Sequence, residues 1–483
     1  MSIRFDLLIR NAEVIDGTGA PRFSADIGIR ADRIEQIGDL AHASGSHEID
    51  LGGRVAAPGF IDVHTHDDRL LLSDRSMAPK VSQGVTTVVA GNCGISLAPA
   101  PQSFSAGVTP PLNLLDDSGE WFRFRDFASY VQALESQPSA TNCALLVGHT
   151  TLRLATMDRT DRPATPSEIT AMQQLVEQSL AAGAIGVSTG LFYEPAISAP
   201  PDEVIEVCRP LTGHRGVYCT HMRCEGDRII DSLEETFRVG RELDIPVIIS
   251  HHKVIGRANY GRSAETLAII ERAMSRQTVC LDCYPYAAGS TILSADRAAT
   301  SERVLVTWSR GMPEHAGREL ATIAAELGLT QEQAIERLLP AGAIYFRMHE
   351  DDVQRILAFE PTMIGSDGLP HDDAPHPRLW GTFPRVLGHY SRSLGLFPLE
   401  RAIHKMTGLS ARNFGLTDRG VLTEGAFADL ALFDPATVDA GSTYESPLEH
   451  AKGIDTVIVN GRIVWRDGQS AGEHPGRVLR RLS

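Results

Sequence analysis

The chain has 483 residues, of which 42% are hydrophobic and 22% charged, so its composition is that of a globular protein large enough for a barrel and a second module. Its net charge of −16 and its pI near 5.5 argue against nucleic acid or an anionic membrane surface as the main partner. No apolar run is long enough to span a bilayer, and the first residues lack a signal peptide's apolar block and cleavage site, so we expect a cytoplasmic protein.

Both ends of the chain are predicted to form short β-strands. Residues 1–57 contain FDLLIRNAEVI and DIGIRADRIEQIG, and residues 418–483 contain FADLALFDP and IDTVIVNGRIVWRDG. The two blocks share alternating apolar residues and Asp/Gly turns. This shared pattern predicts one small β domain made from both termini, with residues 58–417 inserted between its two parts.

The inserted segment alternates short apolar strands with helical patterns. The helical pattern TPSEITAMQQLVEQSLAAG opens with a Thr cap and a Pro and ends in Gly, and DSLEETFRVGRELD and SAETLAIIERAMSR follow it. The predicted strands end within Val63–His66, Val88–Cys93, Ala144–His149, Ile185–Thr189, Val217–His221, Val247–His251, Val279–Tyr284 and Met363–Asp367. Eight such units predict an α/β fold of the (β/α)₈ TIM-like barrel type. The long connection at about 286–361 predicts extra helices that form a lid over the barrel mouth.

Polar side chains follow every predicted strand, and in a (β/α)₈ enzyme the chemistry lies at these carboxyl ends. His64 and His66 end the first strand one residue apart, so their side chains share a face. The residues that follow the later strands are Cys93, His149, Tyr193, His221, His251 with His252, Tyr284 and Asp367. Each could be a buried core or loop residue by itself. Histidines and an aspartate at four strand ends on one rim together predict a hydrolytic metal centre.

The seven cysteines do not indicate a disulfide framework, because their number is odd and they are scattered along the chain. Cys280 and Cys283 form a C-x-x-C inside the strand-like run TVCLDCYPY. Residues three apart on a strand face opposite sides, so we interpret this pair as packing residues.

Long motifs of the chain resemble one family. GFIDVHTHDD, QGVTTVVAGNCGISLAP, THMR, ISHHK, YPYAAGST, MIGSDGLPHD, HPRLWGTFPRVLGHY and HPGRVLRR are similar to the N-acyl-D-amino-acid deacylase (D-aminoacylase) family of the amidohydrolase superfamily. The likeness extends over nearly the whole chain. It implies hydrolysis of the amide bond of an N-acyl-D-amino acid, a small-molecule substrate, with a zinc cofactor.

The resemblance also implies the metal ligands. Many amidohydrolases carry a lysine after strand four, but this chain has VSTGLFYEP there, and Cys93 occupies the place of the family's cysteine after strand two. A tightly held Zn²⁺ would then be bound by Cys93, His221 and His251, which is a donor set that favours zinc and leaves a position open. A second, weaker site would comprise His64, His66 and Asp367. His252 should point away from the site on a regular strand and is expected to pack.

The chemistry that the resemblance implies is zinc-assisted attack of water on the amide carbonyl. Asp367 is the expected general base, which takes a proton from the water and passes it to the leaving amine. Tyr193 is a candidate donor to the developing oxyanion, and the alternative is a rim aromatic that only packs. His149 could bond near the centre or fill the rim, and we leave it out of the catalytic set.

An N-acyl amino acid has a free carboxylate, and the family-matched candidates to bind it are Lys253, Tyr284, Ser290 and Arg378. Arg297, in the lid segment, is a further cation whose alternative is a solvated arginine. If it faces the pocket, D-glutamate derivatives are favoured; if it does not, apolar residues such as leucine or methionine are favoured. We lean slightly to N-acyl-D-glutamate. Cys224 stands in THMRCEG where close relatives are expected to have an acidic residue, and the two alternatives are that it alters the loop beside His221 or that it is neutral.

Two further functions remain open. One is another amide hydrolase of the superfamily, of the hydantoinase or dihydroorotase type, against which the missing strand-four lysine and Cys93 both argue. The other is a catalytically silent scaffold, which would be expected to lose ligands that this chain keeps. The preference for D over L substrates rests wholly on the resemblance.

Overall fold

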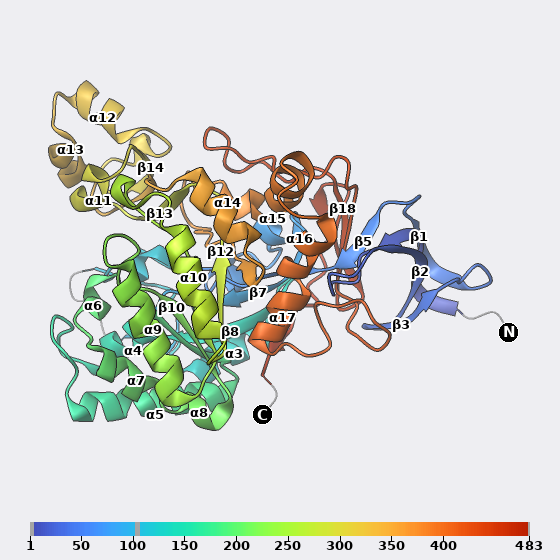
Figure 1. Cartoon of the computed structure of the whole chain (residues 1–483), viewed down its shortest axis with the longest axis horizontal. Coiled ribbons are helices and arrows are strands. Elements are labelled where there is room, and N and C mark those ends of the chain that lie inside the picture. Colours follow the sequence, from blue (N-terminus) through green and yellow to red (C-terminus); the bar gives the residue numbers. More distant parts are fainter. Residues whose placement is uncertain (1–3, 102–106, 482–483) are drawn as a thin grey trace.

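The two ends of the chain come together in one nine-stranded sheet. The computed structural model describes residues 4–101 and 107–481. The sheet contains β1 (Arg4–Val14), β2 (Phe23–Arg30), β3 (Arg33–Gly38), β4 (Ser44–Asp50), β5 (Val55–Pro58), β17 (Leu430–Phe433), β18 (Ile454–Val459), β19 (Arg462–Arg466) and β20 (Gln469–Ser470). At its centre β5 pairs antiparallel with β17, which joins the N-terminal and C-terminal parts of the sheet. In Figure 1, β1, β2, β3 and β5 of the N-terminal part (blue) lie on the same side of the molecule as β18 (red). The predicted β domain built from both ends is confirmed.

The tight turns of this sheet follow from the sequence. Asn460 and Gly461 connect β18 to β19, and both have positive φ angles of 47° and 76°. Asn and Gly adopt this conformation at the lowest cost, which is why they form two-residue hairpin turns. Asp467 and Gly468 connect β19 to β20 in the same way. Apolar residues of both parts then share one cluster, including Leu7, Ile29, Leu432 and Ile458.

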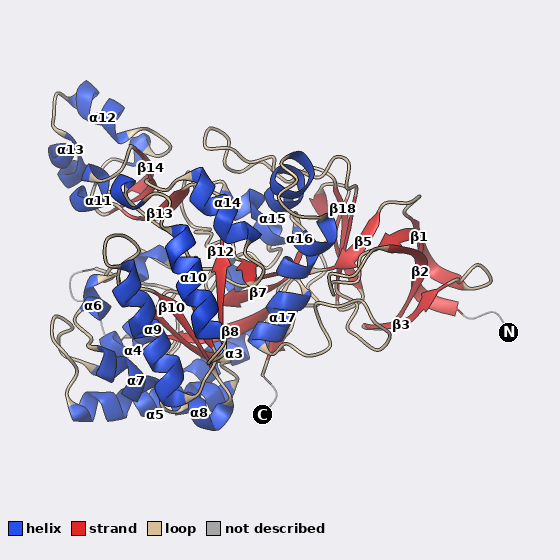
Figure 2. Cartoon of the chain, viewed as in Figure 1, coloured by secondary structure: helices blue, strands red, loops and turns tan. Residues whose placement is uncertain are grey.

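The middle of the chain forms the predicted barrel. Its strands are β6 (Phe60–Asp62), β7 (Val85–Ala90), β8 (Asn142–Gly148), β9 (Gly186–Gly190), β10 (Val217–His221), β11 (Val247–Ile249), β12 (Val279–Cys283) and β16 (Thr362–Ile364). Each strand pairs parallel with the next along the chain. A bridge between Thr65 and Gly368 connects the first strand to the last, so the sheet closes. Helices surround the strands (Figure 2).

Packing inside and outside the barrel explains the apolar strands. Side chains that point inward form one cluster, which includes Ile61, Val89, Leu146, Val217, Ile248 and Met363. The helices α5 (Pro166–Ala182), α9 (Ile229–Leu243) and α10 (Ser263–Met274) cover the outside, where they were predicted. In α5, Thr165 and Glu168 form a capping box and Gly183 ends the helix with φ 117°.

The connection between β12 and β16 contains more than helices. It holds a three-stranded antiparallel sheet of β13 (Ala288–Ile292), β15 (Ala341–Phe346) and β14 (Arg303–Ser309). The helices α11 (Ala295–Ala299), α12 (Leu320–Leu327) and α13 (Gln331–Leu338) belong to the same segment, at the upper left of Figure 1. The sequence predicted extra helices here and missed this sheet: β13 (AGSTI) is short and polar, but β14 (RVLVTWS) and β15 (AGAIYF) are apolar and largely buried. The helix α14 (Glu350–Ala358) then returns to the barrel wall.

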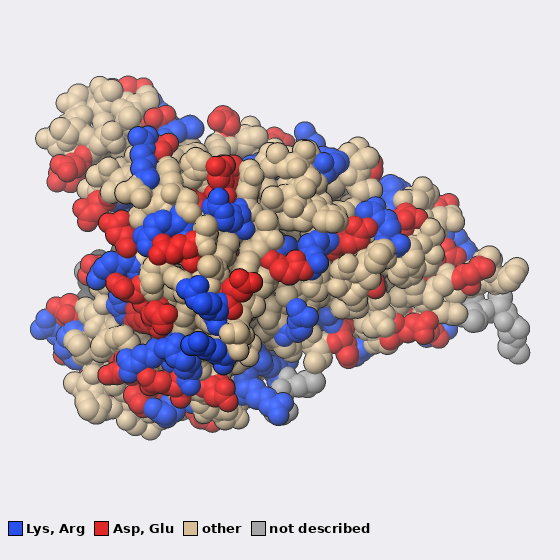
Figure 3. Space-filling view, in the orientation of Figure 1, with Lys and Arg blue, Asp and Glu red and all other residues tan. Residues whose placement is uncertain are grey.

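The last residues of the chain leave the β domain. β21 (Val478–Leu479) pairs parallel with β8, and Leu479 packs against the interior barrel cluster. The predicted C-terminal part of the β domain, 418–483, therefore includes a strand, β21, that pairs with the barrel instead. No helix in the described part of the chain has the length and apolar character needed to cross a membrane. Acidic and basic side chains are interspersed over the face in Figure 3.

Candidate metal centre and substrate pocket

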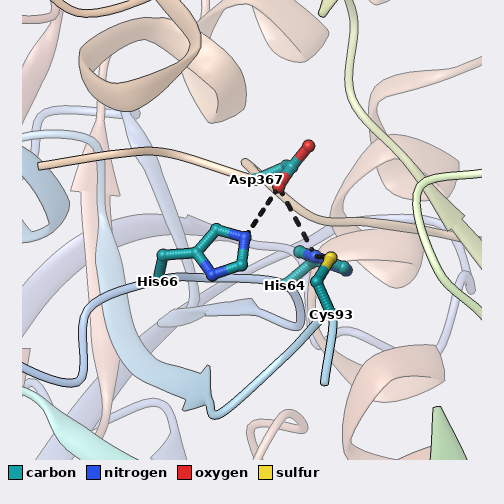
Figure 4. Close-up of side chains that lie close together, drawn as sticks. All are labelled: His64, His66, Cys93 and Asp367. Atoms are coloured by element: carbon teal, nitrogen blue, oxygen red, sulfur yellow. Dashed lines mark hydrogen bonds and ion pairs between the residues drawn. The ribbon is translucent and has the colours of Figure 1, made fainter. Parts of the chain in front are cut away.

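Six potential metal ligands converge at the carboxyl ends of the barrel strands. All are buried, and they come from five strands: His64 and His66 after β6, Cys93 after β7, His221 at the end of β10, His251 after β11 and Asp367 after β16. Figure 4 shows four of them, with the Asp367 carboxylate directed at the two histidines after β6. The structure thus brings together every residue that the sequence proposed as a ligand.

The ligand atoms form two groups that share the Cys93 sulfur. In the first group, Cys93 Sγ lies 3.3 Å from His251 Nε2, which lies 3.1 Å from His221 Nδ1. In the second, Cys93 Sγ lies 3.3 Å from His64 Nε2. Asp367 Oδ1 lies 3.2 Å from His66 Nε2 and 3.5 Å from His64 Nε2.

These separations fit a metal ion. Nitrogen and sulfur ligands around a tetrahedral zinc lie roughly 3.3–3.8 Å from one another, given bonds of about 2.0–2.3 Å. A thiolate with imidazoles is a donor set that favours zinc, and a carboxylate is compatible with it. The chain after β9 continues as Leu191-Phe192-Tyr193, so no lysine occupies that strand end. Cys93 is the side chain between the two groups instead.

The backbone bends sharply at three of the ligands. Cys93, His251 and Asp367 have φ angles of 52°, 36° and 51°, a left-handed conformation that is uncommon for residues other than glycine. The strand β11 therefore ends before His251. The rule that successive side chains of a strand point to opposite faces does not apply to His251. His252 still points away from the site, because its Nε2 lies 2.9 Å from Thr266 Oγ1.

Charges within the cluster favour a thiolate beside imidazolium rings when no ion is bound. Burial raises the pKa of Cys93, but His64 and His251 outweigh it and hold the pKa well below its usual value. Burial lowers the pKa of His64, but Cys93 and Asp282 raise it well above the usual value. For Asp367, burial raises the pKa, and Arg378 and His251 bring it well below the ordinary range. The carboxylate is therefore ionised.

Sequence reasoning missed Glu225, which contacts two of the ligands. Its Oε1 accepts a hydrogen bond from Lys253 Nζ at 2.6 Å and lies 3.2 Å from His251 Nδ1. Its Oε2 lies 3.7 Å from His221 Nε2. Glu225 is part of the motif THMRCEG, in which sequence reasoning singled out only the preceding residue, Cys224. That cysteine is half-buried, and its backbone N–H donates to Ser232 Oγ.

Asp282 is a second residue that sequence reasoning missed. Its Oδ1 accepts a hydrogen bond from the backbone N–H of His251 at 2.9 Å, and its Oδ2 lies 3.6 Å from His64 Nδ1. A Cβ on Gly365 would lie 2.5 Å from His64 Cβ and 2.9 Å from Asp282 Oδ1, so glycine is required there. The signal for Asp282 was a charged residue within the apolar run TVCLDCYPY.

The five fully buried cysteines other than Cys93 pack in the apolar clusters. All seven are free, as predicted. Cys280 belongs to the cluster inside the barrel and Cys283 to the cluster outside it. They face opposite sides of β12, so they cannot share a metal ion.

A pocket opens over the ligand cluster. Its lining includes Tyr193, Lys253, Tyr284, Ser290 and Arg378, all of which the sequence proposed for substrate or catalysis. The hydroxyl of Tyr193 lies 3.0 Å from Thr291 Oγ1, and its ring centroid lies 5.2 Å from that of His221.

Arg378 connects the metal ligands to this pocket. Its Nη1 lies 2.9 Å from Asp367 Oδ2, and its Nη2 donates to the Ser290 carbonyl at 3.2 Å. Its Cζ lies 4.6 Å from the ring centroid of Tyr284. The Nε donor of this buried side chain has no partner among the described residues.

Two candidates lie outside the pocket lining. Arg297 donates from Nη1 to Ser294 Oγ at 3.0 Å, its Cζ lies 4.8 Å from the Phe192 ring centroid, and it lines a neighbouring hollow. α11 is only a short turn after β13, and it directs this side chain toward that hollow. His149 is buried at the start of α4 (His149–Thr156), 3.5 Å from Glu203 Oε1, which agrees with its omission from the catalytic set.

The comparisons with known proteins agree with this architecture. The model of the Amidohydrolase family matches residues 47–333 and 295–465. A D-aminoacylase of Alcaligenes xylosoxydans xylosoxydans is 58% identical over 479 residues, which cover 99% of this chain and 98% of that protein. The chain belongs to the amidohydrolase family. The resemblance to D-aminoacylases that the motifs indicated is confirmed.

Two more relatives act on acidic substrates according to their names. An N-acyl-D-aspartate deacylase of the same organism is 53% identical over 475 residues, 98% of this chain and 95% of that protein. The crystal structure of an N-acyl-D-glutamate deacylase from Bordetella bronchiseptica, complexed with zinc and a phosphonate mimic of the tetrahedral intermediate, superposes with a TM-score of 0.95. It is 45% identical, and the alignment covers 99% of this chain and 100% of that one.

Proposed function

We propose that this protein is a zinc-dependent hydrolase that cleaves the amide bond of N-acyl-D-amino acids and releases a carboxylate and a free D-amino acid. The observation that carries the proposal is the pair of ligand groups around Cys93, at the floor of a pocket that contains Lys253 and Arg378. The names of the related deacylases support the substrate class, and the preference for the D isomer rests on them.

In this proposal Cys93, His221 and His251 hold the tightly bound zinc, and His64, His66 and Asp367 form the weaker second site. When bound, the ion supplies Lewis-acid polarisation of the substrate carbonyl and lowers the pKa of water. Glu225 and Lys253 fix the orientation of His251, because both contact its Nδ1 side. Such outer contacts set which ring nitrogen is free to bind a metal.

Asp367 is the proposed general base. Arg378 and the surrounding histidines keep it ionised, so it can take a proton from the attacking water and pass it to the leaving amine. Tyr193 is the proposed donor to the developing oxyanion. Burial and the nearby Cys93 raise the pKa of Tyr193, so its hydroxyl remains a proton donor near neutral pH.

The α-carboxylate of the substrate is proposed to bind at Arg378, with Lys253, Tyr284 and Ser290. The unpartnered Nε of Arg378 supports this, because a buried donor without a partner is costly until a ligand satisfies it. A guanidinium fork also matches a carboxylate by two parallel hydrogen bonds. Arg297 lines a neighbouring hollow that shares Phe192 and Tyr193 with this pocket, and its selection of D-glutamate stays a prediction of the sequence.

The test is amine release from N-acetyl-D-glutamate, N-acetyl-D-leucine and their L isomers, with zinc content measured on the same sample. We expect turnover of at least one D substrate, with the L isomers poor. Turnover of the L isomers alone, or of none with zinc present, would contradict the proposal and favour another amide of the superfamily or a silent scaffold.

A further inference from the structure

The pocket over the metal centre contains one cation without a counter-charge. Its lining includes five charged side chains, Glu225, Lys253, Arg347, Asp367 and Arg378. Lys253 pairs with Glu225 at 2.6 Å, and Arg378 pairs with Asp367 at 2.9 Å. Within residues 4–101 and 107–481, the Arg347 guanidinium has no ion pair and no hydrogen bond, and its contact is with the Tyr345 ring, whose centroid lies 5.5 Å from Cζ.

The main chain of Arg347 is held in place at the end of β15. It follows β15 directly, and its carbonyl accepts a hydrogen bond from the N–H of Gly256 at 2.9 Å. The pocket lining also contains the apolar side chains of Phe192, Ile255, Met348 and Leu369. Burial lowers the pKa of the Arg347 guanidinium; Glu225 acts against that shift and Arg297 adds to it. An anion bound beside Arg347 would offset both unfavourable contributions.

The other cations already have a proposed ligand. Arg378 lies beside Asp367, Tyr284 and Ser290, where the α-carboxylate of the substrate is expected. A second carboxylate is present only when the side chain of the amino acid is acidic. Because Arg347 lines the same pocket from the end of β15 and has no ion pair in the described chain, it is available for that second group.

We propose that Arg347 binds the side-chain carboxylate of the substrate and so makes acidic N-acyl-D-amino acids better substrates than apolar ones. This rests on the proposed function of the same pocket. The apolar side chains of the pocket lining contact the methylene groups of the substrate's side chain. The Arg347 guanidinium binds the carboxylate of that side chain by two parallel hydrogen bonds. Arg347 is thus a specificity residue and takes no part in bond cleavage.

The test compares kcat/KM for N-acetyl-D-glutamate with kcat/KM for N-acetyl-D-methionine in the zinc-loaded enzyme. Arg347→Met should lower the glutamate-to-methionine ratio roughly 10- to 100-fold, the range expected for loss of a charge-assisted hydrogen bond. Arg347→Lys should restore part of it. Arg303→Met is the matched control, because Arg303 lies 5.1 Å from the Phe346 ring and pairs with Glu319 outside the pocket lining. Its ratio should equal that of the wild type.

A second readout does not depend on turnover. In zinc-depleted protein, a given concentration of N-acetyl-D-glutamate should raise the melting temperature of the wild type and of Arg303→Met by more than that of Arg347→Met, which keeps only the α-carboxylate contacts. The melting temperature without ligand shows whether Arg347→Met is folded.

Several outcomes would overturn the inference. They are an unchanged ratio in folded Arg347→Met, a loss that appears in Arg297→Met instead, or a wild type that hydrolyses the methionine substrate but not the glutamate one. The last result would leave the proposed deacylase function intact. A wild type that hydrolyses neither substrate would refute that function, and the inference with it.

Discussion

Replacing Glu225 with glutamine tests whether a residue that is not itself a metal ligand determines metal binding. Glu225 is 1% exposed and contacts Lys253 and two metal-ligating histidines, His221 and His251. Burial raises the pKa of Glu225, but Lys253, His221 and His251 lower it by more, so the group is ionised at neutral pH. Glu225→Gln keeps the shape of the side chain and removes only its charge.

The expected loss follows from these contacts. Without the carboxylate, the ammonium of Lys253 remains buried beside His251, where it repels a bound cation, and both histidines lose an orienting acceptor. Outer contacts of this kind change metal affinity by about 10- to 100-fold each. The two histidines share one carboxylate, so their effects are not additive, and about 100-fold, or about 2.7 kcal/mol, is the expected total.

The assay is competition for zinc between the protein and a chromogenic chelator, with circular dichroism to check folding. Glu203→Gln is the matched control. Glu203 is also a buried glutamate, 2% exposed, paired with Arg153 and close to His149, but it contacts no metal ligand. It should lose stability without losing zinc affinity.

Two results would refute this reasoning. One is zinc affinity in folded Glu225→Gln equal to that of the wild type. The other is an equal loss of affinity in both variants, which would show that general destabilisation explains the effect.

Three further changes test other parts of the structure. Asp367→Asn should abolish nearly all turnover while the fold and the zinc at Cys93 are retained; measurable turnover in a zinc-loaded variant would exclude Asp367 as the base. In zinc-free protein, burial lowers the pKa of His66, but Asp367 and Cys93 raise it to about 9. Its stabilising contribution is therefore complete below pH 6.5 and lost as pH rises through about 9, so the melting-temperature difference between wild type and His66→Gln should shrink over that range. A difference that stays constant would contradict the raised pKa. Removing residues 478–483 deletes β21 and exposes barrel side chains, which should lower the unfolding free energy in urea by about 2 kcal/mol without abolishing turnover; unchanged stability would contradict this packing.

Much of the metal centre could be predicted from the sequence because each ligand directly follows a buried apolar strand. The parallel order of those strands places their carboxyl ends on one rim, so His64, Cys93, His221 and Asp367 converge although they are far apart in sequence. The same local patterns predicted the caps of α5 and the hairpin turns of the β domain, since caps and turns depend on a few consecutive residues.

The contacts behind the ligands could not be predicted in this way. Lys253 and Glu225 are 28 residues apart, and nothing in either motif shows that they meet. The sheet of the lid segment was missed because its antiparallel strands do not follow the alternation of strand and helix that identifies the barrel strands. Arg297 lies on α11 and lines a neighbouring hollow, whereas Arg347 lines the pocket over the metal centre, and neither position could be predicted from the sequence.

The sequence by itself determined the barrel, the β domain made from both termini and the residues that gather at the strand ends, because strand periodicity and turn chemistry are local properties. Only the tertiary structure decided which charges are paired. Lys253 and Arg378 have carboxylate partners within 3 Å, whereas Arg347 has none in the described chain. Charge pairing depends on distances across the pocket between residues from separate strand ends, and neither composition nor spacing along the chain contains those distances.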